Sequence, residues 1–197
     1  MRTSKILIAT AFMFFTMNVF GSNEIEIRVY NQEMKTFLME LEYSESTDVS
    51  ITIEDESGHI LLSKKFKNTI ELRKKINMKN LPDGSYSLKV KEENKTVILP
   101  LEIKDERLWY SGERRTYFKP MVNMINNRLL FNQLSLHGLP YFIRIDDKNG
   151  DCVFAGKYDN DIVNQKIFNV SQISGGNYTM TMRNDEITYK EKFSLGH

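Results

Sequence analysis

The strongest constraint on this chain is a pattern that occurs twice, at a constant offset of 92 residues. When residues 49–103 are laid over residues 141–195 without a gap, 12 of the 55 pairs are identical. The identical pairs are spread over the whole segment and include isoleucines, turn glycines and a tyrosine: Ile51 and Ile143, Gly58 and Gly150, Gly84 and Gly176, Tyr86 and Tyr178. A constant register through several strands and turns indicates an internal duplication, so we expect two copies of one folding unit.

Each copy alternates apolar and polar residues with a period of two. "VSITIED" (49–55) and "SYSLKV" (85–90) both show this alternation, and so do their partners 92 residues later. A period of two is typical of a strand with one face against a core and the other in water. Glycines in "DESG", "LPDG", "DKNG" and "ISGG" mark the turns between such strands. In the strand expected over 95–103, Pro100 cannot donate to a ladder and predicts an edge or a bulge.

Further alternating segments raise the count to about seven short strands per copy. "EIEIRVY" and "FLMELEY" precede the first copy, and "YFKPMVNMI" and "RLLFNQLSL" precede the second, with a turn expected at Asn126 and Asn127. A short helix over "MVNMINNRLLFNQL" is the alternative, although the paired asparagines interrupt its apolar stripe. This count and spacing predict an all-β fold of two tandem immunoglobulin-like antiparallel β-sandwiches after a cleaved signal peptide.

The first residues have the composition of a secretory signal peptide. Lys5 precedes the apolar run "ILIATAFMFFTMNVF", and Gly21 and Ser22 offer small side chains for cleavage. A membrane anchor is the alternative, but the run is shorter than the roughly 20 residues that a spanning helix needs. We therefore predict a secreted or periplasmic protein with no membrane span after cleavage. The predicted organisation is a signal peptide (1–21), a first sandwich (22–104), a short connection (105–115) and a second sandwich (116–197).

Charge and cysteine content narrow the class of protein. Removal of residues 1–21 takes Arg2 and Lys5 away, which leaves 25 basic against 26 acidic residues and a formal charge of −1. A near-neutral chain has no long-range field to attract nucleic acid, so we expect no nucleic-acid partner. Cys152 is the single cysteine, which excludes an internal disulfide. Its place at the start of the apolar run "CVFA" predicts a buried small side chain, with an intermolecular disulfide or a reactive thiol as alternatives.

These residues resemble a known group of domains. The pattern "VSITIEDESGHIL" followed by "LPDGSYSLKV" is similar to the exported immunoglobulin-like β-sandwich domains of unknown function found in Gram-negative bacteria. It is also distantly similar to the secretion-tail sorting domains of the type IX export route. The resemblance covers about 55 residues of each copy and implies the sandwich fold and export. Because the pattern occurs twice, the likeness is closer to the stand-alone exported sandwich.

The sequence offers no motif for catalysis. It contains no nucleophile elbow, no H-E-x-x-H pair, no P-loop and no dinucleotide-binding glycine run, so we predict no catalytic residue, no metal and no cofactor. His59, His137 and His197 lack the paired spacing of zinc ligands. The acidic segment "DDKNGD", Asp146–Asp151, could supply oxygen ligands to calcium or form a polar hairpin turn. The corresponding "EDESGH" of the first copy favours the turn.

Aromatic residues near the expected join are the weak candidates for binding. They are Trp109, Tyr110, Tyr117 and Phe118. Exposed rings could form a platform for sugars or an anchor for a protein, whereas buried rings would fill the seam between the two sandwiches. We expect a non-enzymatic interaction or structural module of the cell envelope or extracellular space. Its expected partner is another envelope or extracellular protein, or a polysaccharide; the alternative is a carbohydrate-binding module that uses these aromatics.

Overall fold

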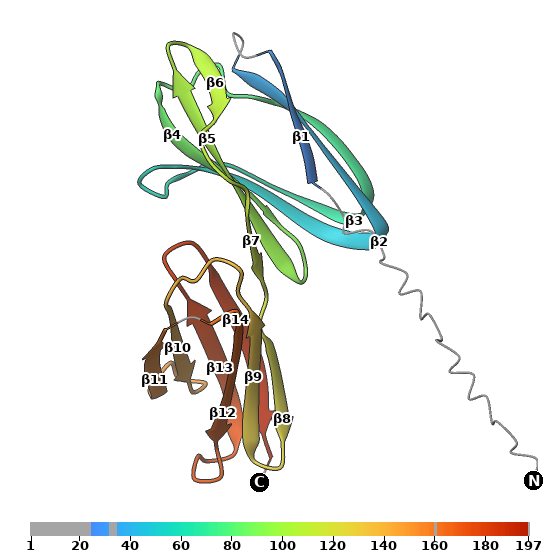
Figure 1. The fold of residues 1–197 in the computed structure, drawn as a ribbon. Helices are drawn as coiled ribbons and strands as arrows, with labels where there is room; N and C mark the ends of the chain where they lie inside the picture. The colour runs from blue at the N-terminus through green and yellow to red at the C-terminus, as the bar shows by residue number, and fades with distance from the viewer. Residues whose placement is uncertain (1–24, 32–34, 160, 197) are drawn as a thin grey trace, which may run out of the picture.

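The computed structural model describes residues 25–31, 35–159 and 161–196, and all regular secondary structure in these residues is β. Figure 1 shows two β units that follow one another along the molecule, with β7 between them. The predicted signal peptide, residues 1–21, lies outside the described residues. The all-β prediction is therefore confirmed for the described residues, and the helix considered over 121–134 is replaced by a hairpin of two strands.

The first unit is one continuous sheet of strongly bent strands. Its strands are β1 (Ile25–Asn31), β2 (Thr36–Asp55), β3 (Ile60–Asn77), β4 (Gly84–Lys91), β5 (Lys95–Lys104), β6 (Arg107–Tyr110) and β7 (Arg115–Phe118). The order is β1-β2-β4-β5-β6, with β3 also on β2 and β7 also on β5. The long strands β2 and β3 pair twice, once beside β1 and once beside β4, with register shifts between these two parts. Their bend brings the two parts into two layers.

The second unit consists of two separate antiparallel sheets. Its strands are β8 (Met121–Ile125), β9 (Arg128–Leu134), β10 (Tyr141–Asp146), β11 (Cys152–Tyr158), β12 (Val163–Asn169), β13 (Gly176–Arg183) and β14 (Thr188–Leu195). One sheet has the order β11-β10-β13-β14 and the other β12-β9-β8. Asn126 and Asn127 both have positive φ in the β8–β9 turn, as a tight hairpin of primed type requires. This is the sandwich of seven short strands that the alternation predicts.

The two units share one pairing register at the 92-residue offset. Ile51 opposes Val90 in the first unit, and Ile143 opposes Met182 in the second. The pairing of β2 with β3 also recurs in β9 with β12 and in β10 with β11, including a register shift at Glu54 and at Asp146. Because side chains alternate along a strand, an equal register puts equivalent residues on equivalent faces. The duplicated sequence pattern thus corresponds to duplicated pairing.

The long strand β2 of the first unit corresponds to two separate strands, β9 and β10, in the second unit. Where β2 runs on through "SESTD", the equivalent segment "LHGLP" contains Gly138 with φ 64° and Pro140, which has no N–H for a ladder. β9 ends before this segment and β10 begins after it. In the first unit the chain bends instead at a bulge, where the Asn68 N–H donates to the Asp48 carboxylate at 3.0 Å. The two units therefore differ at this point, with one continuous strand in the first and two separate strands in the second.

Each unit has its own hydrophobic core. The first is built from inward residues of β2 to β6, among them Phe37, Met39 and Leu88, all fully buried. The second is built around Phe131 and Ile143, also fully buried. Ile98 of β5 belongs to the second core although its strand belongs to the first sheet. The units are therefore packed against each other. The domain boundaries 22–104 and 116–197 stay a prediction.

Both copies of the "G-x-Y" segment form the same corner. The Tyr86 hydroxyl donates to the Pro82 carbonyl at 2.8 Å, and the Tyr178 hydroxyl donates to the Ser174 carbonyl at 2.6 Å. A tyrosine that bonds the backbone four residues upstream is a hallmark of immunoglobulin-like sandwiches, where it fixes the entry of a strand. The corner explains why the chain repeats a turn followed by tyrosine and an alternating strand.

Two details differ from, or refine, the sequence-based expectations. Cys152 is exposed, so the prediction of a buried cysteine is wrong. It begins β11, an edge strand whose outward positions face water, and its thiol lies 3.3 Å from the Phe154 carbonyl.

Pro100 lies where the partner of β5 changes from β7 to β6, a position that needs no N–H donor on that side.

Candidate interaction surfaces

The four aromatic candidates do not form one surface. Trp109 and Tyr110 lie on β6, which pairs with the end of β5 at Leu101–Lys104, whereas β7 pairs with Lys95–Ile98. Trp109 pairs with Glu102 and Tyr117 pairs with Thr96, six positions apart on β5, which corresponds to about 20 Å along the strand. Trp109 and Tyr110 are each 42% exposed, but neighbouring residues of a strand point to opposite faces. The structure therefore does not bring these rings into a flat row.

Tyr117 fills the seam between the units. It is only 2% exposed, and its ring centroid lies 5.2 Å from that of His137. The Tyr189 hydroxyl donates to the Tyr117 carbonyl at 2.8 Å and also contacts the Thr96 hydroxyl at 3.0 Å, which ties β14 to β5. Phe118, the next residue, is half-buried.

Desolvation raises the pKa of Tyr110 to about 12, so its hydroxyl stays neutral under all physiological conditions.

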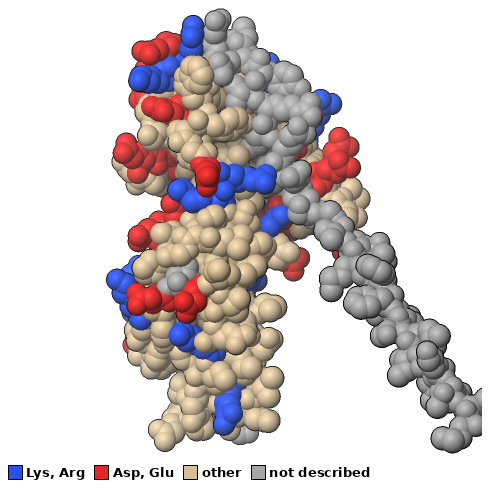
Figure 2. Space-filling model, in the orientation of Figure 1, with Lys and Arg blue, Asp and Glu red and all other residues tan. Residues whose placement is uncertain are grey.

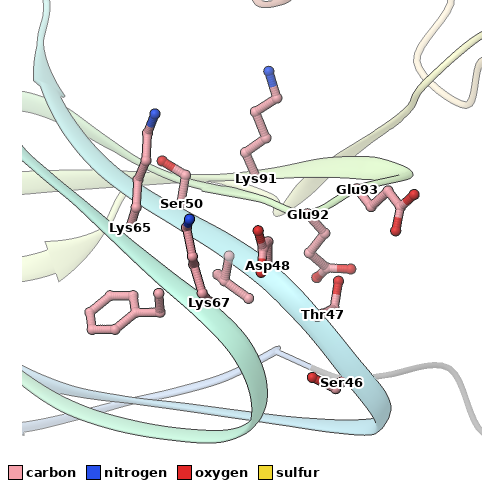
Figure 3. Close-up of a pocket in the computed structure, with 11 residues that line it drawn as sticks. Ser46, Thr47, Asp48, Ser50, Lys65, Lys67, Lys91, Glu92 and Glu93 are labelled. Carbon is pink, nitrogen blue, oxygen red and sulfur yellow. The ribbon is translucent and has the colours of Figure 1, made fainter.

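A groove of about 640 Å³ lies on the first unit where β2 changes register. Its lining combines hydroxyl, carboxylate and ammonium groups: Ser46, Thr47, Asp48, Val49, Ser50, Lys65, Phe66, Lys67, Lys91, Glu92 and Glu93. Ser50 pairs with Lys65 on one side and with Lys91 on the other, so these three form a row across the sheet. Figure 3 shows Lys65, Lys67 and Lys91 extending in the same direction.

Glu92, the buried carboxylate of this groove, has partners within the fold. Glu92 is 6% exposed, receives a hydrogen bond from Tyr43 at 3.3 Å and pairs with Lys95 at 3.5 Å. Burial raises the pKa of Glu92, and the nearby Lys95 charge offsets part of this rise. Burial together with the Glu92 charge raises the pKa of the Tyr43 hydroxyl. The lining holds neither histidine nor cysteine, so the groove has no pair of nucleophile and imidazole base.

The acidic segment Asp146–Asp151 forms a hairpin turn in which Asp147 binds its own backbone. Its carboxylate accepts from the N–H groups of Asn149 at 2.8 Å and Asp151 at 2.9 Å, and these bonds lower its pKa. Asp55 does the same for the His59 N–H in the first unit. No cluster of three or more metal-ligating side chains occurs among the described residues. In the described structure, the Asp147 carboxylate therefore accepts hydrogen bonds from the backbone of its own turn, as the turn interpretation predicts.

The most distinctive surface is the outer face of the sheet β12-β9-β8, which we name the docking face. Its outward positions hold six apolar residues, four amides and one charge: Met121, Ile125, Leu130, Leu134, Val163, Ile167, Asn123, Asn132, Gln165, Asn169 and Arg128. Met121 and Ile167 are each 65% exposed and Val163 is 59% exposed. In Figure 2 the lower unit is largely tan where β9 and β8 lie in Figure 1. Contiguous exposed apolar side chains of this kind mark interaction sites.

The same face of the first unit is charged. At the 92-residue offset, Glu42 stands in place of Leu134, Glu71 in place of Val163, and Lys75 in place of Ile167. Arg73 and Glu40 form an ion pair at 2.5 Å across this face, where the second unit pairs Gln165 with Asn132. One fold thus presents a water-adapted face in one unit and an apolar face in the other.

Sequence reasoning missed the docking face although a signal for it exists. β8, "MVNMI", and β9, "RLLFNQL", carry apolar residues on both parities of the strand, whereas β2 around residues 36–42 alternates strictly after Leu38. A strand that is apolar on both faces is expected to be covered on both faces. In the described structure nothing covers the outer face, so the sequence pattern and the exposure point to the same surface.

Comparison with solved structures gives matches of low similarity. The chain is similar to the BSP domain of a biofilm-associated protein, with 14% identity and a TM-score of 0.30 over 87% of this chain and 29% of that one. It is also similar to a segment of two fibronectin type III domains from chicken tenascin, with 7% identity and a TM-score of 0.31 over 88% of this chain and 98% of that one. The chain therefore spans about 29% of the length of the first of these. No curated protein sequence matches it.

Among the described residues, no helical segment has the length and hydrophobicity of a membrane span.

The family comparison concerns the first unit. Residues 34–104, a range that includes β2 to β5, match the secretion system C-terminal sorting domain, and a domain of this kind implies that the protein is exported.

Proposed function

We propose that this protein is a non-enzymatic interaction module that works outside the cytoplasm, secreted or in the periplasm, and binds another envelope or extracellular protein through the docking face. The observation that carries the proposal is the exposure of five apolar residues on one sheet face whose counterpart in the first unit is charged: Met121, Ile125, Leu134, Val163 and Ile167. The signal-peptide pattern of residues 1–21 and the sorting-domain match support export.

The composition of the docking face favours a protein partner. Aliphatic side chains and amides bury well against another protein, whereas sugar rings are bound chiefly by exposed aromatic rings. The docking face carries no aromatic side chain, and the exposed rings Trp109 and Tyr110 point away from each other on β6. Polysaccharide binding therefore has less support than protein binding. Arg128 is the one positive charge of this face, and nucleic-acid binding needs several basic side chains to neutralise phosphates.

Site-specific photo-cross-linking in the producing cells tests the proposal. A photoreactive phenylalanine analogue at position 167 lies on the docking face, and the same analogue at position 75 lies at the equivalent place of the first unit. We expect a defined cross-linked product from position 167 and none from position 75. Equal products from both positions, or none from either, would contradict the proposal.

A further inference from the structure

We propose that the occupant of the docking face is a second copy of this chain, so that two second units pack face to face around a two-fold axis. The inference rests on the proposed function, because it names the partner of the same surface. It follows from the chemistry of the face, from its size and from the charged side chains on the equivalent face of the first unit.

The polar groups of the docking face are self-complementary. A two-fold interface places the same patch on both sides, so each group must tolerate its own kind as a partner. Asn123, Asn132, Gln165 and Asn169 each carry a donor and an acceptor, and an amide can therefore bond an amide from the other copy. A patch of carboxylates or ammonium groups would repel its copy, and the only charge here, Arg128, lies at the turn end of β9.

The apolar residues occupy neighbouring positions that can meet their own copies. Leu130 opposes Ile167 and Leu134 opposes Val163 across the β9–β12 pair, while Met121 lies beside Asn132 on the other side. Packing of two such faces removes aliphatic side chains from water on both copies, and the one charge of the face, Arg128, lies at its border beside the β8–β9 turn. The surface therefore gains from burial against itself.

The size of the face sets the expected strength. Three strands spaced by about 4.8 Å and about 7 residues long cover roughly 14 by 24 Å. This is smaller than the roughly 800 Å² per partner of a standard stable complex. We therefore expect a reversible dimer with a dissociation constant in the micromolar range, not a permanent one.

The first unit is not suited to the same contact. Its equivalent face carries Glu42, Glu71 and Lys75 where the second unit has Leu134, Val163 and Ile167. Face-to-face packing of two such faces would remove these charges from water and bring like charges together. We therefore expect association through the second unit.

Sedimentation velocity of the purified full exported chain tests the inference over a concentration series from about 1 µM to about 1 mM. We expect a concentration-dependent dimer. Ile167→Lys, which copies the first unit's Lys75, is expected to weaken it at least about tenfold, whereas the control Ile70→Lys, at an isoleucine of the first unit that is 58% exposed, leaves it unchanged. A chain that stays monomeric throughout, or a dimer insensitive to Ile167→Lys, overturns the inference.

Disulfide trapping provides a second readout of the geometry. Asn132 lies on the middle strand, where a two-fold axis through the face brings it near its own copy. In a Cys152→Ser background, Asn132→Cys is expected to form a chain-to-chain disulfide much faster than Glu40→Cys at the equivalent place of the first unit. Equal rates contradict face-to-face packing. If the chain is monomeric while position 167 still cross-links another protein in cells, the dimer inference fails and the proposed function stands.

Discussion

The outer face of β12, β9 and β8 and the equivalent face of β2 and β3 share a backbone register but not a surface chemistry. The first unit pairs Glu40 with Arg73 where the second pairs Asn132 with Gln165. The inward positions of both remain apolar, as shown by Met39 and Phe131, each fully buried. A sandwich needs only its inward residues to fold, so the outward residues of a duplicated unit are free to take on a binding role.

The largest expected loss of stability concerns the inward positions. Because both units bury these side chains fully, we expect losses of similar size in the two units. Phe131→Ala should destabilise the protein by about 3–5 kcal/mol and its counterpart Met39→Ala by about 2–5 kcal/mol, because each removes a fully buried side chain and leaves a cavity. Urea unfolding followed by circular dichroism measures both. The outward variant Leu130→Ala serves as the control and should cost clearly less. A loss below about 1 kcal/mol for Phe131→Ala would show that this core is not the one described.

The tyrosine corners should also be equivalent in the two units. Tyr86→Phe and Tyr178→Phe each remove one hydroxyl that bonds a backbone carbonyl, so each should cost about 1 kcal/mol. The two losses should add in the double variant, since the corners belong to different cores. Thermal unfolding curves of the three variants test this. A corner whose loss leaves stability unchanged would break the equivalence of the units.

A smaller effect should distinguish the β4–β5 turns of the two units by pH. Glu92 in the first unit corresponds to Asn184, which cannot titrate and accepts the N–H groups of Glu186 and Ile187. Burial raises the pKa of folded Glu92 above its unfolded value, so the folded state binds this proton more tightly. The resulting stabilisation is complete below the unfolded pKa of about 4.5 and is lost as the pH rises through the raised pKa.

Glu92→Gln should therefore remove this pH dependence from the first unit. The free energy of unfolding of the parent protein relative to this variant should fall as the pH rises from about 4 toward neutrality. Trp109, the single tryptophan, lies on β6 of the first unit and reports on its unfolding by fluorescence. Glu93→Gln, at an exposed neighbouring carboxylate, is the matched control. A difference that stays constant with pH would contradict the assignment.

The smallest effect is expected at the outward positions themselves. Ile167→Lys and Lys75→Ile exchange the two units' residues at one exposed place, so each should change the free energy of unfolding by less than about 0.5 kcal/mol. Denaturant unfolding at a concentration where the chain is monomeric measures this. A large loss for Ile167→Lys would mean that the isoleucine supports the fold and not association.

Much of the fold could be predicted from the sequence because strands leave a local trace. The alternation around Ile51 and Ile143, the turn at Asn126 and the constant offset all predicted antiparallel pairing, and the paired registers bear this out. The exposure of Cys152 was not predictable in this way. It depends on which strand lies at a sheet edge, and the alternating pattern alone does not say that.

The candidate site was less accessible to sequence reasoning. Trp109 and Tyr117 are close along the chain, yet β6 and β7 pair with opposite ends of β5 and carry them apart. The docking face shows the reverse case. Met121 and Ile167 are distant in sequence, yet they lie on the same face of one three-stranded sheet. Proximity along the chain is a poor guide to proximity on a sheet whose strands come from different segments.

The β class and the inward residues follow from the sequence alone, because period-two alternation and turn glycines act over a few residues. Three features became visible in the folded chain: the first unit is one bent sheet, Ile98 completes the second core, and one sheet face of the second unit lies uncovered. Those outcomes depend on which strands pair at long range, and this is set by packing of the whole chain and not by local preference.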